Sequence, residues 1–296
     1  MATIAILKGD KPNQTSEAYK TFRSLEQVGG DDYSLILYRD LVFEISQTGA
    51  DIVYQGKSLK EFDLVYIRDF QGYEHERNTV ALFLQKHGIR FLNQDVAQFQ
   101  HLSKLSQYMT YSFNGLPIPH SWYGSGEEFL TTIAEKNAFP LIVKSITANS
   151  GNDNFVVHDK EQLFATFKDH GHKKLIIQEA IQNEGDYRLI VLGDSVSCVY
   201  YRKAQAGDHR NNISQGGEKQ YLALSDVPEG LIALAVAAAK AVNREICGVD
   251  IMVHSGTQEP VVLEANFNFG IRAIDGTISD EIYGLAEYLH TQAHQE

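Results

Sequence analysis

The stretches Gly248-Val249-Asp250-Ile251-Met252 and Val261-Val262-Leu263-Glu264-Ala265-Asn266 decide how this sequence is interpreted. Both are apolar, strand-like runs, and each carries carboxylate or amide side chains where burial should discourage them. The turn between them lies near Ser255 to Gln258. An antiparallel hairpin centred on that turn places Asp250 opposite Glu264, within one residue.

Asn266 lies two residues after Glu264 and therefore shares its face of the strand. Two carboxylates and an amide, without histidine or cysteine, are hard oxygen ligands that suit Mg²⁺ bridging nucleotide phosphates. The alternative interpretation is an ordinary hairpin whose acidic residues face solvent. The apolar neighbours and the shared face favour the metal site.

Length and composition indicate a globular protein of two or three modest units. Hydrophobic residues make up 43% of the 296 positions and charged residues 22%, which is a globular balance. No run approaches the roughly 18 to 20 apolar residues of a membrane span, so we expect none. The N-terminus lacks signal-peptide features, and two distant cysteines are too few for a disulfide framework. A reducing cytoplasm is the expected location.

The overall charge argues against nucleic acid and anionic membranes as partners. The net charge is -12 and the pI is near 5.4, so like charges would repel such surfaces. Any phosphate-bearing ligand must be held locally, by small clusters of lysine and arginine.

The first third of the chain alternates strand-like and helical patterns, which predicts an α/β unit with a parallel sheet. Arg68 directly follows an expected strand, where parallel sheets carry ligand-facing loops, and is a candidate substrate residue. The expected strands are Ile4 to Leu7, Leu35 to Tyr38, Leu64 to Ile67 and Ile89 to Leu92, with helices at Ser16 to Gln27 and Glu74 to His87.

Two further units are expected after this one. A helical pattern from Val96 to Phe113 and the breaker-rich Gly115 to Pro119 lead into the second unit. The third has long hairpins around Gly193-Asp194 and Ser255-Gly256. We therefore divide the chain into 1–97, 98–177 and 178–296. The remaining expected elements are the strands Leu141 to Ser145, Phe155 to His158 and Leu175 to Gln178, the hairpins Tyr187 to Lys203 and Gly248 to Asn266, and the helices Glu161 to Lys168 and Pro228 to Val242.

Cationic and amide side chains in the second and third units are candidate phosphate ligands. Lys144 ends an apolar strand and precedes the small-residue loop Ser145 to Asn152, whose backbone N–H groups could close over phosphate. The strand Leu175 to Ile181 could offer backbone groups to a purine edge. Taken singly, each feature also fits a plain strand end, edge strand or solvated loop. A cluster suited to a transferring phosphoryl group contains Arg188, Arg202, Lys203, Arg210, Asn211 and Asn212.

Taken in order, these segments resemble the ATP-grasp ligases, and within them the RimK-like branch that includes ribosomal-protein glutamate ligases. The likeness covers roughly Asp95 to the C-terminus, and more loosely the N-terminal unit. The family's S-P-G after E-x-N is replaced here by Phe267-Asn268-Phe269-Gly270. The family's strand lysine, small loop, Q-E hinge, D-x-R, R-N-N-like loop with G-G, G-V-D-I and E-x-N are matched by Lys144, Ser150-Gly151, Gln178-Glu179, Asp186-Tyr187-Arg188, Arg210-Asn211-Asn212 with Gly216-Gly217, Gly248-Val249-Asp250-Ile251 and Glu264-Ala265-Asn266.

The resemblance implies a mixed α/β and α+β fold, in which an N-terminal parallel-sheet domain precedes two subdomains that clamp ATP. It also implies a role for each matched residue. Mg²⁺, with Mn²⁺ able to replace it, would be held by Asp250, Glu264 and Asn266. ATP would be held by Lys104, Lys144, Ser150, Gly151, Gln178, Glu179, Ala180, Ile181, Asp186, Arg210 and Asn211. Catalytic contacts would come from Arg188, Arg202 and Asn212, and the carboxylate substrate would meet Arg68 and Arg202.

The resulting hypothesis is an ATP-dependent carbon–nitrogen ligase that forms an amide or peptide bond through an acyl phosphate. It needs no side-chain nucleophile, which agrees with the lack of a Ser-His-Asp or Cys-His signature. The alternatives are a nucleotide-binding regulatory module without turnover and an unrelated metal-dependent hydrolase. Amino acids, peptides and protein tails remain open as substrates, and related ligases lead us to expect a homodimer or homotetramer.

Overall fold

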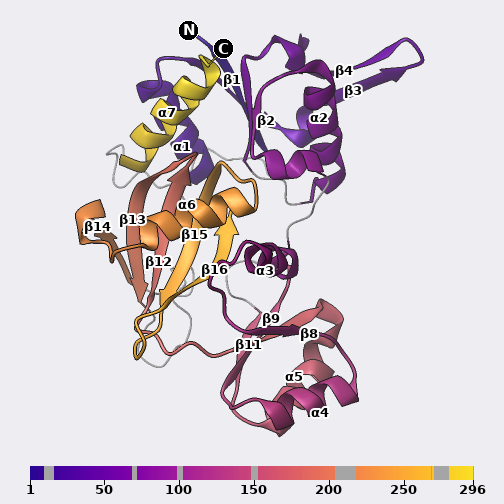
Figure 1. Cartoon of the computed structure of the whole chain (residues 1–296). Helices are drawn as coiled ribbons and strands as arrows, with labels where there is room; N and C mark the ends of the chain where they lie inside the picture. The colour runs from indigo at the N-terminus through magenta and orange to yellow at the C-terminus, as the bar shows by residue number, and fades with distance from the viewer. Residues whose placement is uncertain are drawn as a thin grey trace.

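The computed structural model has a mixed α/β fold, as the sequence predicts, and its described residues form four sheets. It describes residues 1–9, 17–68, 72–98, 103–147, 153–203, 218–267, 269 and 280–295. Figure 1 shows the N-terminal part at the top, the C-terminal sheet in the middle and the central part at the bottom. Among the described residues, no helix has the length and apolar character that a membrane crossing needs.

The N-terminal sheet is parallel, with strand order β2-β1-β6-β7. All four strands and both helices lie close to the ranges expected from the sequence. A small antiparallel sheet of β3 (Val42–Ser46), β4 (Gly49–Tyr54) and β5 (Lys57–Ser58) was not foreseen. The parallel strands are β1 (Thr3–Lys8), β2 (Asp32–Leu37), β6 (Leu64–Ile67) and β7 (Phe91–Leu92), with helices α1 (Glu17–Val28) and α2 (Glu74–His87).

The helix expected over Val96 to Phe113 is wrong as one element. A 3₁₀ helix spans Gln94–Gln98, and the α-helix α3 spans Lys104–Phe113. Ser103 has an extended backbone, and its hydroxyl accepts the N–H of Ser106, so it caps a new helix. The apolar periodicity runs on past Ser103, but serine is favoured at the N-cap of a helix, so a new helix begins there.

The central sheet is antiparallel, with order β10-β9-β11-β8. Its helices cover one face, where Leu130 and Leu163 pack with Val143. Because side chains alternate along a strand, Lys144 points to the opposite face, toward α3. The strands are β8 (Ser121–Tyr123), β9 (Leu141–Ser145), β10 (Asn154–Val157) and β11 (Leu175–Glu179), and the helices are α4 (Glu127–Lys136) and α5 (Lys160–His170).

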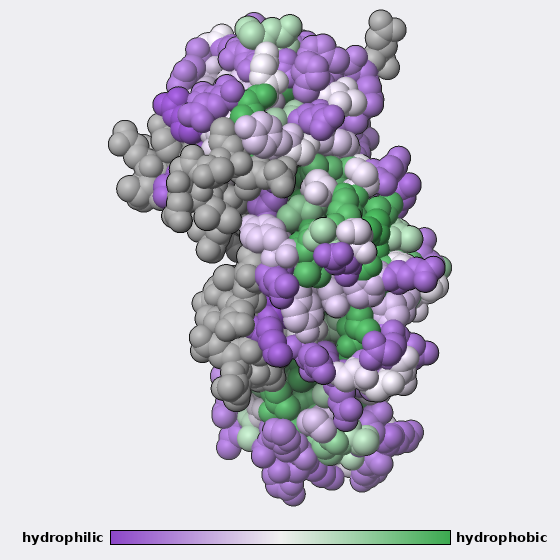
Figure 2. All heavy atoms as spheres, turned by 90° about the vertical axis from the view of Figure 1, so that its left-hand side faces the viewer, coloured by the Kyte–Doolittle hydropathy of each residue, from purple (hydrophilic) through white to green (hydrophobic). Residues whose placement is uncertain are grey.

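The C-terminal sheet has order β14-β13-β12-β15-β16, and both hairpins expected from the sequence are present. Its apolar face packs against α6 (Leu231–Ala241), whose sequence is apolar on nearly every side. Figure 2 shows hydrophobic side chains gathered at mid-height, the level of α6 in Figure 1. The strands are β12 (Asp186–Leu192), β13 (Ser195–Lys203), β14 (Glu218–Leu222), β15 (Ile246–Val253) and β16 (Pro260–Asn266).

The last helix, α7 (Asp280–Ala293), was not expected from the sequence. It contacts β1 and β6 of the N-terminal sheet as well as β12 and β13 of the C-terminal sheet. One core joins these elements, with Ile6, Tyr66, Tyr200 and Leu285 among its members. The boundaries at 97/98 and 177/178 stay predictions.

Candidate active site

The polar face of the C-terminal sheet carries six of the predicted site residues that the structure describes. Asp186 faces Arg202 across β12 and β13, and Arg188 faces Asp250 across β12 and β15. Asp250 in turn faces Glu264 across β15 and β16. The opposite face of the same strands is apolar and packs on α6. Because side chains alternate along a strand, the polar site residues and the apolar core residues lie on different faces of the sheet.

The three predicted metal ligands lie together. Asp250 and Glu264 are direct cross-strand neighbours, and the Asn266 amide nitrogen donates to Asp250 Oδ2 at 3.2 Å and to Glu264 Oε1 at 2.8 Å. A register shift follows Asp250, because Ile251 pairs with Val262. The bulge keeps Glu264 and Asn266 on the polar face, while Val262 stays in the core.

Arginines neutralise Asp250 and Asp186. Arg188 binds Asp250 through two hydrogen bonds of 2.6 Å each. Arg202 binds Asp186 in the same way, at 2.6 and 2.8 Å, and also lies 3.1 Å from Asp250 Oδ2. Burial raises the pKa of Asp186 in spite of Arg202, whereas Asp250 outweighs burial and raises the pKa of Arg188. Paired, planar contacts of this kind fix the arginines against the sheet.

Lys104, the first residue of α3, neutralises Glu264. Its ammonium nitrogen lies 3.0 Å from Glu264 Oε2. Burial by itself would raise the pKa of Glu264, but Lys104 and Asn266 outweigh it and lower the pKa to about 2. The sequence matched Lys104 by its place on the linking helix, and the structure brings it to the acidic hairpin.

Lys144 approaches the same helix from the central sheet. Its ammonium nitrogen donates to Tyr108 Oη at 2.8 Å, and Tyr108 Oη lies 3.4 Å from the Gln178 side-chain oxygen. Gln178 is buried and donates to Ser121 at 2.6 Å. Burial, and then repulsion by Lys104, lower the pKa of Lys144 to about 7. Among the described residues, Lys144 thus differs from Lys104, Arg188 and Arg202 in having no ion pair with a carboxylate.

Residues behind β16 hold the strand that carries Glu264 and Asn266, and sequence reasoning missed them. The N–H of Ala265, between Glu264 and Asn266, donates to Gln107 of α3 at 2.9 Å. The Ala265 carbonyl accepts from Arg244, which Asp95 binds at 2.7 Å. β16 is an edge strand, and these contacts satisfy its outer backbone groups. Asp95 and Arg244 are 149 residues apart, so no local pattern signals their contact.

The other predicted residues lie at the margins of this cluster. Arg68 is 9% exposed at the end of β6, and its backbone N–H donates to Leu7. Glu179 accepts the N–H of His120 at 2.8 Å, and Ala180 and Ile181 follow it in the segment between β11 and β12. Outside the described residues lie Ser150, Gly151, Arg210, Asn211, Asn212 and Gly216-Gly217.

The unusual segment after β16 has a packing role. Phe269 is 2% exposed in the core shared by the N- and C-terminal sheets. A Cβ at Gly248 would lie 2.9 Å from Phe269 and 3.3 Å from Arg188, so only glycine fits beneath them. Phe267 lies 5.0 Å from the guanidinium of Arg244. Phe267 thus packs against Arg244, and Phe269 packs over Gly248 at the start of the acidic hairpin.

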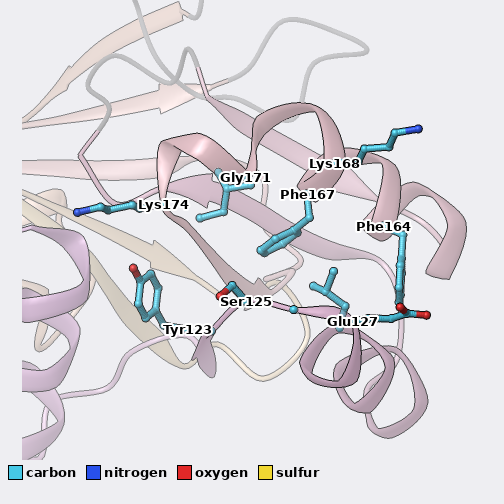
Figure 3. Close-up of a pocket in the computed structure, with 12 residues that line it drawn as sticks. Tyr123, Ser125, Glu127, Phe164, Phe167, Lys168, Gly171 and Lys174 are labelled. Carbon is cyan, nitrogen blue, oxygen red and sulfur yellow. The ribbon is translucent and has the colours of Figure 1, made fainter.

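A separate cavity of about 490 Å³ lies between α4, α5 and the end of β8 (Figure 3). Figure 3 shows Phe167 pointing toward Ser125, while Lys168 points away from the cavity. None of the residues predicted for the site lines it. We therefore do not assign the nucleotide to this cavity.

Comparisons with known proteins agree with this geometry. The sequence model of the RimK-like ATP-grasp domain family matches residues 109–287 of this chain. A probable alpha-L-glutamate ligase of Shewanella loihica is 26% identical, over 98% of this chain and 96% of that protein. The structure of ATP-grasp ligase PsnB complexed with a phosphomimetic variant of minimal precursor, Mg and ADP has a TM-score of 0.75, with 17% identity over 99% of both chains. Macrocyclase MdnC bound with precursor peptide MdnA, from Microcystis aeruginosa, has a TM-score of 0.71, with 16% identity over 98% of this chain and 99% of that one.

Fold and site together define an ATP-dependent ligase of the ATP-grasp class, which joins a carboxylate to an amine. More narrowly, the chain belongs to the RimK-like ATP-grasp family. ATP and Mg²⁺ are the cofactors of this class.

Proposed function

We propose that this protein forms an amide or peptide bond by converting a substrate carboxylate into an acyl phosphate, with ATP giving ADP. An amine then displaces phosphate from the acyl group. The observation that carries the proposal is the convergence of Asp250, Glu264 and Asn266 within a ring of cations. Acyl-phosphate formation gathers negative charge, and such a ring stabilises it.

The donor set fits Mg²⁺, because two carboxylates and an amide supply oxygen ligands alone. The ion would neutralise phosphate charge and orient the phosphates for attack. Asn266 donates its amide N–H to both carboxylates here. To offer its oxygen to the ion instead, the Asn266 side-chain amide must rotate so that its nitrogen and oxygen exchange places. We expect Mn²⁺ to replace Mg²⁺, since it also accepts oxygen ligands.

Cations around the acidic hairpin would hold the phosphates. Lys104 of α3 contacts Glu264, and Lys144 of the central sheet contacts Tyr108 of the same helix, so both ammonium groups lie near the hairpin. Glu179, Ala180 and Ile181 are proposed to bracket the adenine, and Asp186 to reach the nucleoside. Holding both reactants in line can contribute roughly 7 to 11 kcal/mol to catalysis.

Arg68 and Arg202 are proposed to receive the substrate carboxylate. Within the described part of the chain, the guanidinium of Arg68 forms no hydrogen bond or ion pair, although the residue is only 9% exposed. Burying a charge without a partner is costly. A bound carboxylate would supply the missing partner, which supports the assignment.

The names of similar proteins suggest which substrates to try first. One is a probable alpha-L-glutamate ligase, and two structural neighbours carry a precursor or precursor peptide. We propose L-glutamate and a peptide as the substrate pair. We further propose a cytoplasmic enzyme, supported by its free cysteines, Cys198 and Cys247. The expected dimer or tetramer is checked by light scattering.

The decisive experiment incubates the protein with ATP, Mg²⁺, L-glutamate and pooled peptides. Mass spectrometry should then find products lighter by one water than their summed reactants, with ADP formed in equal amount. ATP binding without turnover on any carboxylate and amine pair would instead favour a regulatory nucleotide-binding module.

A further inference from the structure

Two histidines and an aspartate outside the active site bring distant parts of the chain together. His290 lies in the last turn of α7, His294 follows the end of that helix, and Asp31 immediately precedes β2. One potential ligand atom from each residue lies within 4.8 Å of the other two. The proposed ligase chemistry uses none of them.

Hydrogen bonds hold both imidazole rings in place. His290 Nδ1 donates to Asp31 Oδ2 at 2.8 Å, and His294 Nδ1 donates to the carbonyl of His290 at 2.9 Å. The ring centroids are 4.2 Å apart. For Asp31 and His290 to bind one ion together, the ion must take the place of the proton between Asp31 Oδ2 and His290 Nδ1, so that these two atoms become ligands. Because its Nδ1 donates to the carbonyl of His290, His294 can offer the lone pair of its Nε2.

The cluster combines a buried carboxylate with exposed imidazole side chains. The Asp31 side chain is fully buried, and its other oxygen accepts the N–H of Ala2 at 2.9 Å. The His290 side chain is 52% exposed, and His294 is exposed as well. An ion can therefore reach the imidazoles from solvent, and it meets Asp31 Oδ2 by displacing the hydrogen bond from His290.

We propose that Asp31, His290 and His294 form a binding site for one Zn²⁺ ion. Imidazole nitrogen with a carboxylate suits zinc, whereas Mg²⁺ prefers oxygen alone. Two histidines four residues apart lie on one side of a helix and bind one ion together. Ligand atoms around tetrahedral zinc lie about 3.3 Å apart. The ligand atoms lie within 4.8 Å of one another, and His294, exposed and beyond the last helical residue, is the ligand best able to adjust its side chain to the ion.

The ion would tie the end of α7 to the N-terminal sheet. Figure 1 shows α7 beside α1, close to both ends of the chain. The same end of α7 already meets Arg90, which donates to Gln292 and Gln295. Because α7 contacts both the N- and C-terminal sheets, fastening its end stabilises the core that these sheets share.

The test titrates metal-free protein with ZnCl₂ in a calorimeter and follows thermal unfolding at each ratio. The wild type should bind one Zn²⁺ more per chain than His294→Ala, and its Tm should rise until that site is filled. His172→Ala, which removes an exposed histidine elsewhere, should behave as the wild type. Asp31→Asn should lower the affinity of the site for Zn²⁺, because a neutral amide replaces a charged ligand.

A second arm separates this site from the acidic hairpin. Glu264→Gln should keep the histidine site, and Co²⁺ bound in place of Zn²⁺ should give visible absorption that His294→Ala abolishes. Equal zinc stoichiometry and affinity in the wild type and in His294→Ala would overturn the proposal. Loss of the extra zinc in Glu264→Gln would overturn it too. His294→Ala should still form ADP, so the outcome is independent of the ligase assignment.

Discussion

Lys144 should take up a proton when nucleotide binds. Burial, and then the nearby Lys104 ammonium, lower the pKa of Lys144 to about 7, although Glu264 and Asp250 act in the opposite direction. Phosphate groups brought to this end of β9 favour the charged amine. Raising the pKa of Lys144 by two units corresponds to about 2.7 kcal/mol of favourable interaction.

The expected uptake follows from that pKa. At pH 6, 7 and 8 the amine is about 10%, 50% and 90% neutral before binding. A nucleotide that keeps it charged therefore draws in about 0.1, 0.5 and 0.9 proton per chain. Calorimetric titration with MgADP, repeated in buffers of different ionisation enthalpy, measures this number. ADP is used because its own phosphates are ionised at pH 8.

Lys144→Met should abolish the uptake at pH 8, while Lys168→Met, which removes an exposed cation on α5, should retain it. Equal uptake in Lys144→Met and the wild type would refute the reasoning. So would a wild-type uptake that does not increase between pH 6 and pH 8.

Without nucleotide, the same pKa makes stability depend on pH. The unfolded lysine keeps its proton up to about pH 10.5, whereas the folded one loses it above about pH 7. The unfolded state therefore binds more protons between these values, so the contribution of Lys144 to the free energy of unfolding rises with pH, by at most about 1.4 kcal/mol per unit.

Three further substitutions test the site. Glu264→Gln removes a charged ligand at constant size, so ADP formation should fall at least about 100-fold while circular dichroism stays unchanged; undiminished turnover would contradict the metal assignment. Gln107→Leu leaves the buried N–H of Ala265 without its acceptor, which should lower the free energy of unfolding in urea by about 1–3 kcal/mol, whereas the exposed Gln85→Leu should have little effect. Arg68→Ala should raise KM for the carboxylate about tenfold or more and leave KM for ATP unchanged; unaltered carboxylate saturation would mean that the pocket is misplaced.

The sequence predicted those parts of the fold whose signal is local. The acidic hairpin could be placed because its turn and its alternation fix the register, and the structure pairs Asp250 with Glu264 as expected. Strand β6 and helix α2 have the predicted limits, since buried apolar runs and helical spacing define them. The helix over Val96 to Phe113 failed because hydrophobic spacing alone does not reveal a capping residue such as Ser103.

Contacts between distant segments could not be predicted from one sequence. Arg244 and Asp95 look like ordinary surface charges in the chain, yet the structure buries both, with 3% and 5% exposure, behind the metal ligands. The ion pair of Lys104 with Glu264 has the same character. Such pairs depend on how α3 and β16 pack, which no local pattern specifies.

The balance of charge explains why Lys144 differs from its neighbours. Among the described residues, the carboxylates Asp186, Asp250 and Glu264 meet three cations. Within this described cluster the three acids and three bases balance, so burial and the charge of Lys104 favour the neutral amine of Lys144. The three cations are Lys104, Arg188 and Arg202.

We expect nucleotide and metal to change which groups pair with the charged side chains of the site. A metal ion held by Asp250 and Glu264 would take over the role of their cations, and we expect Arg188 and Lys104 to turn to phosphate oxygens. Lys144 would then gain a proton, because the phosphates would supply a counter-charge for its ammonium group. The exchange leaves each buried charge paired in both states, whereas an unpaired intermediate would cost several kcal/mol. Measuring proton uptake therefore tests the whole exchange of partners, and not the titration of a single lysine.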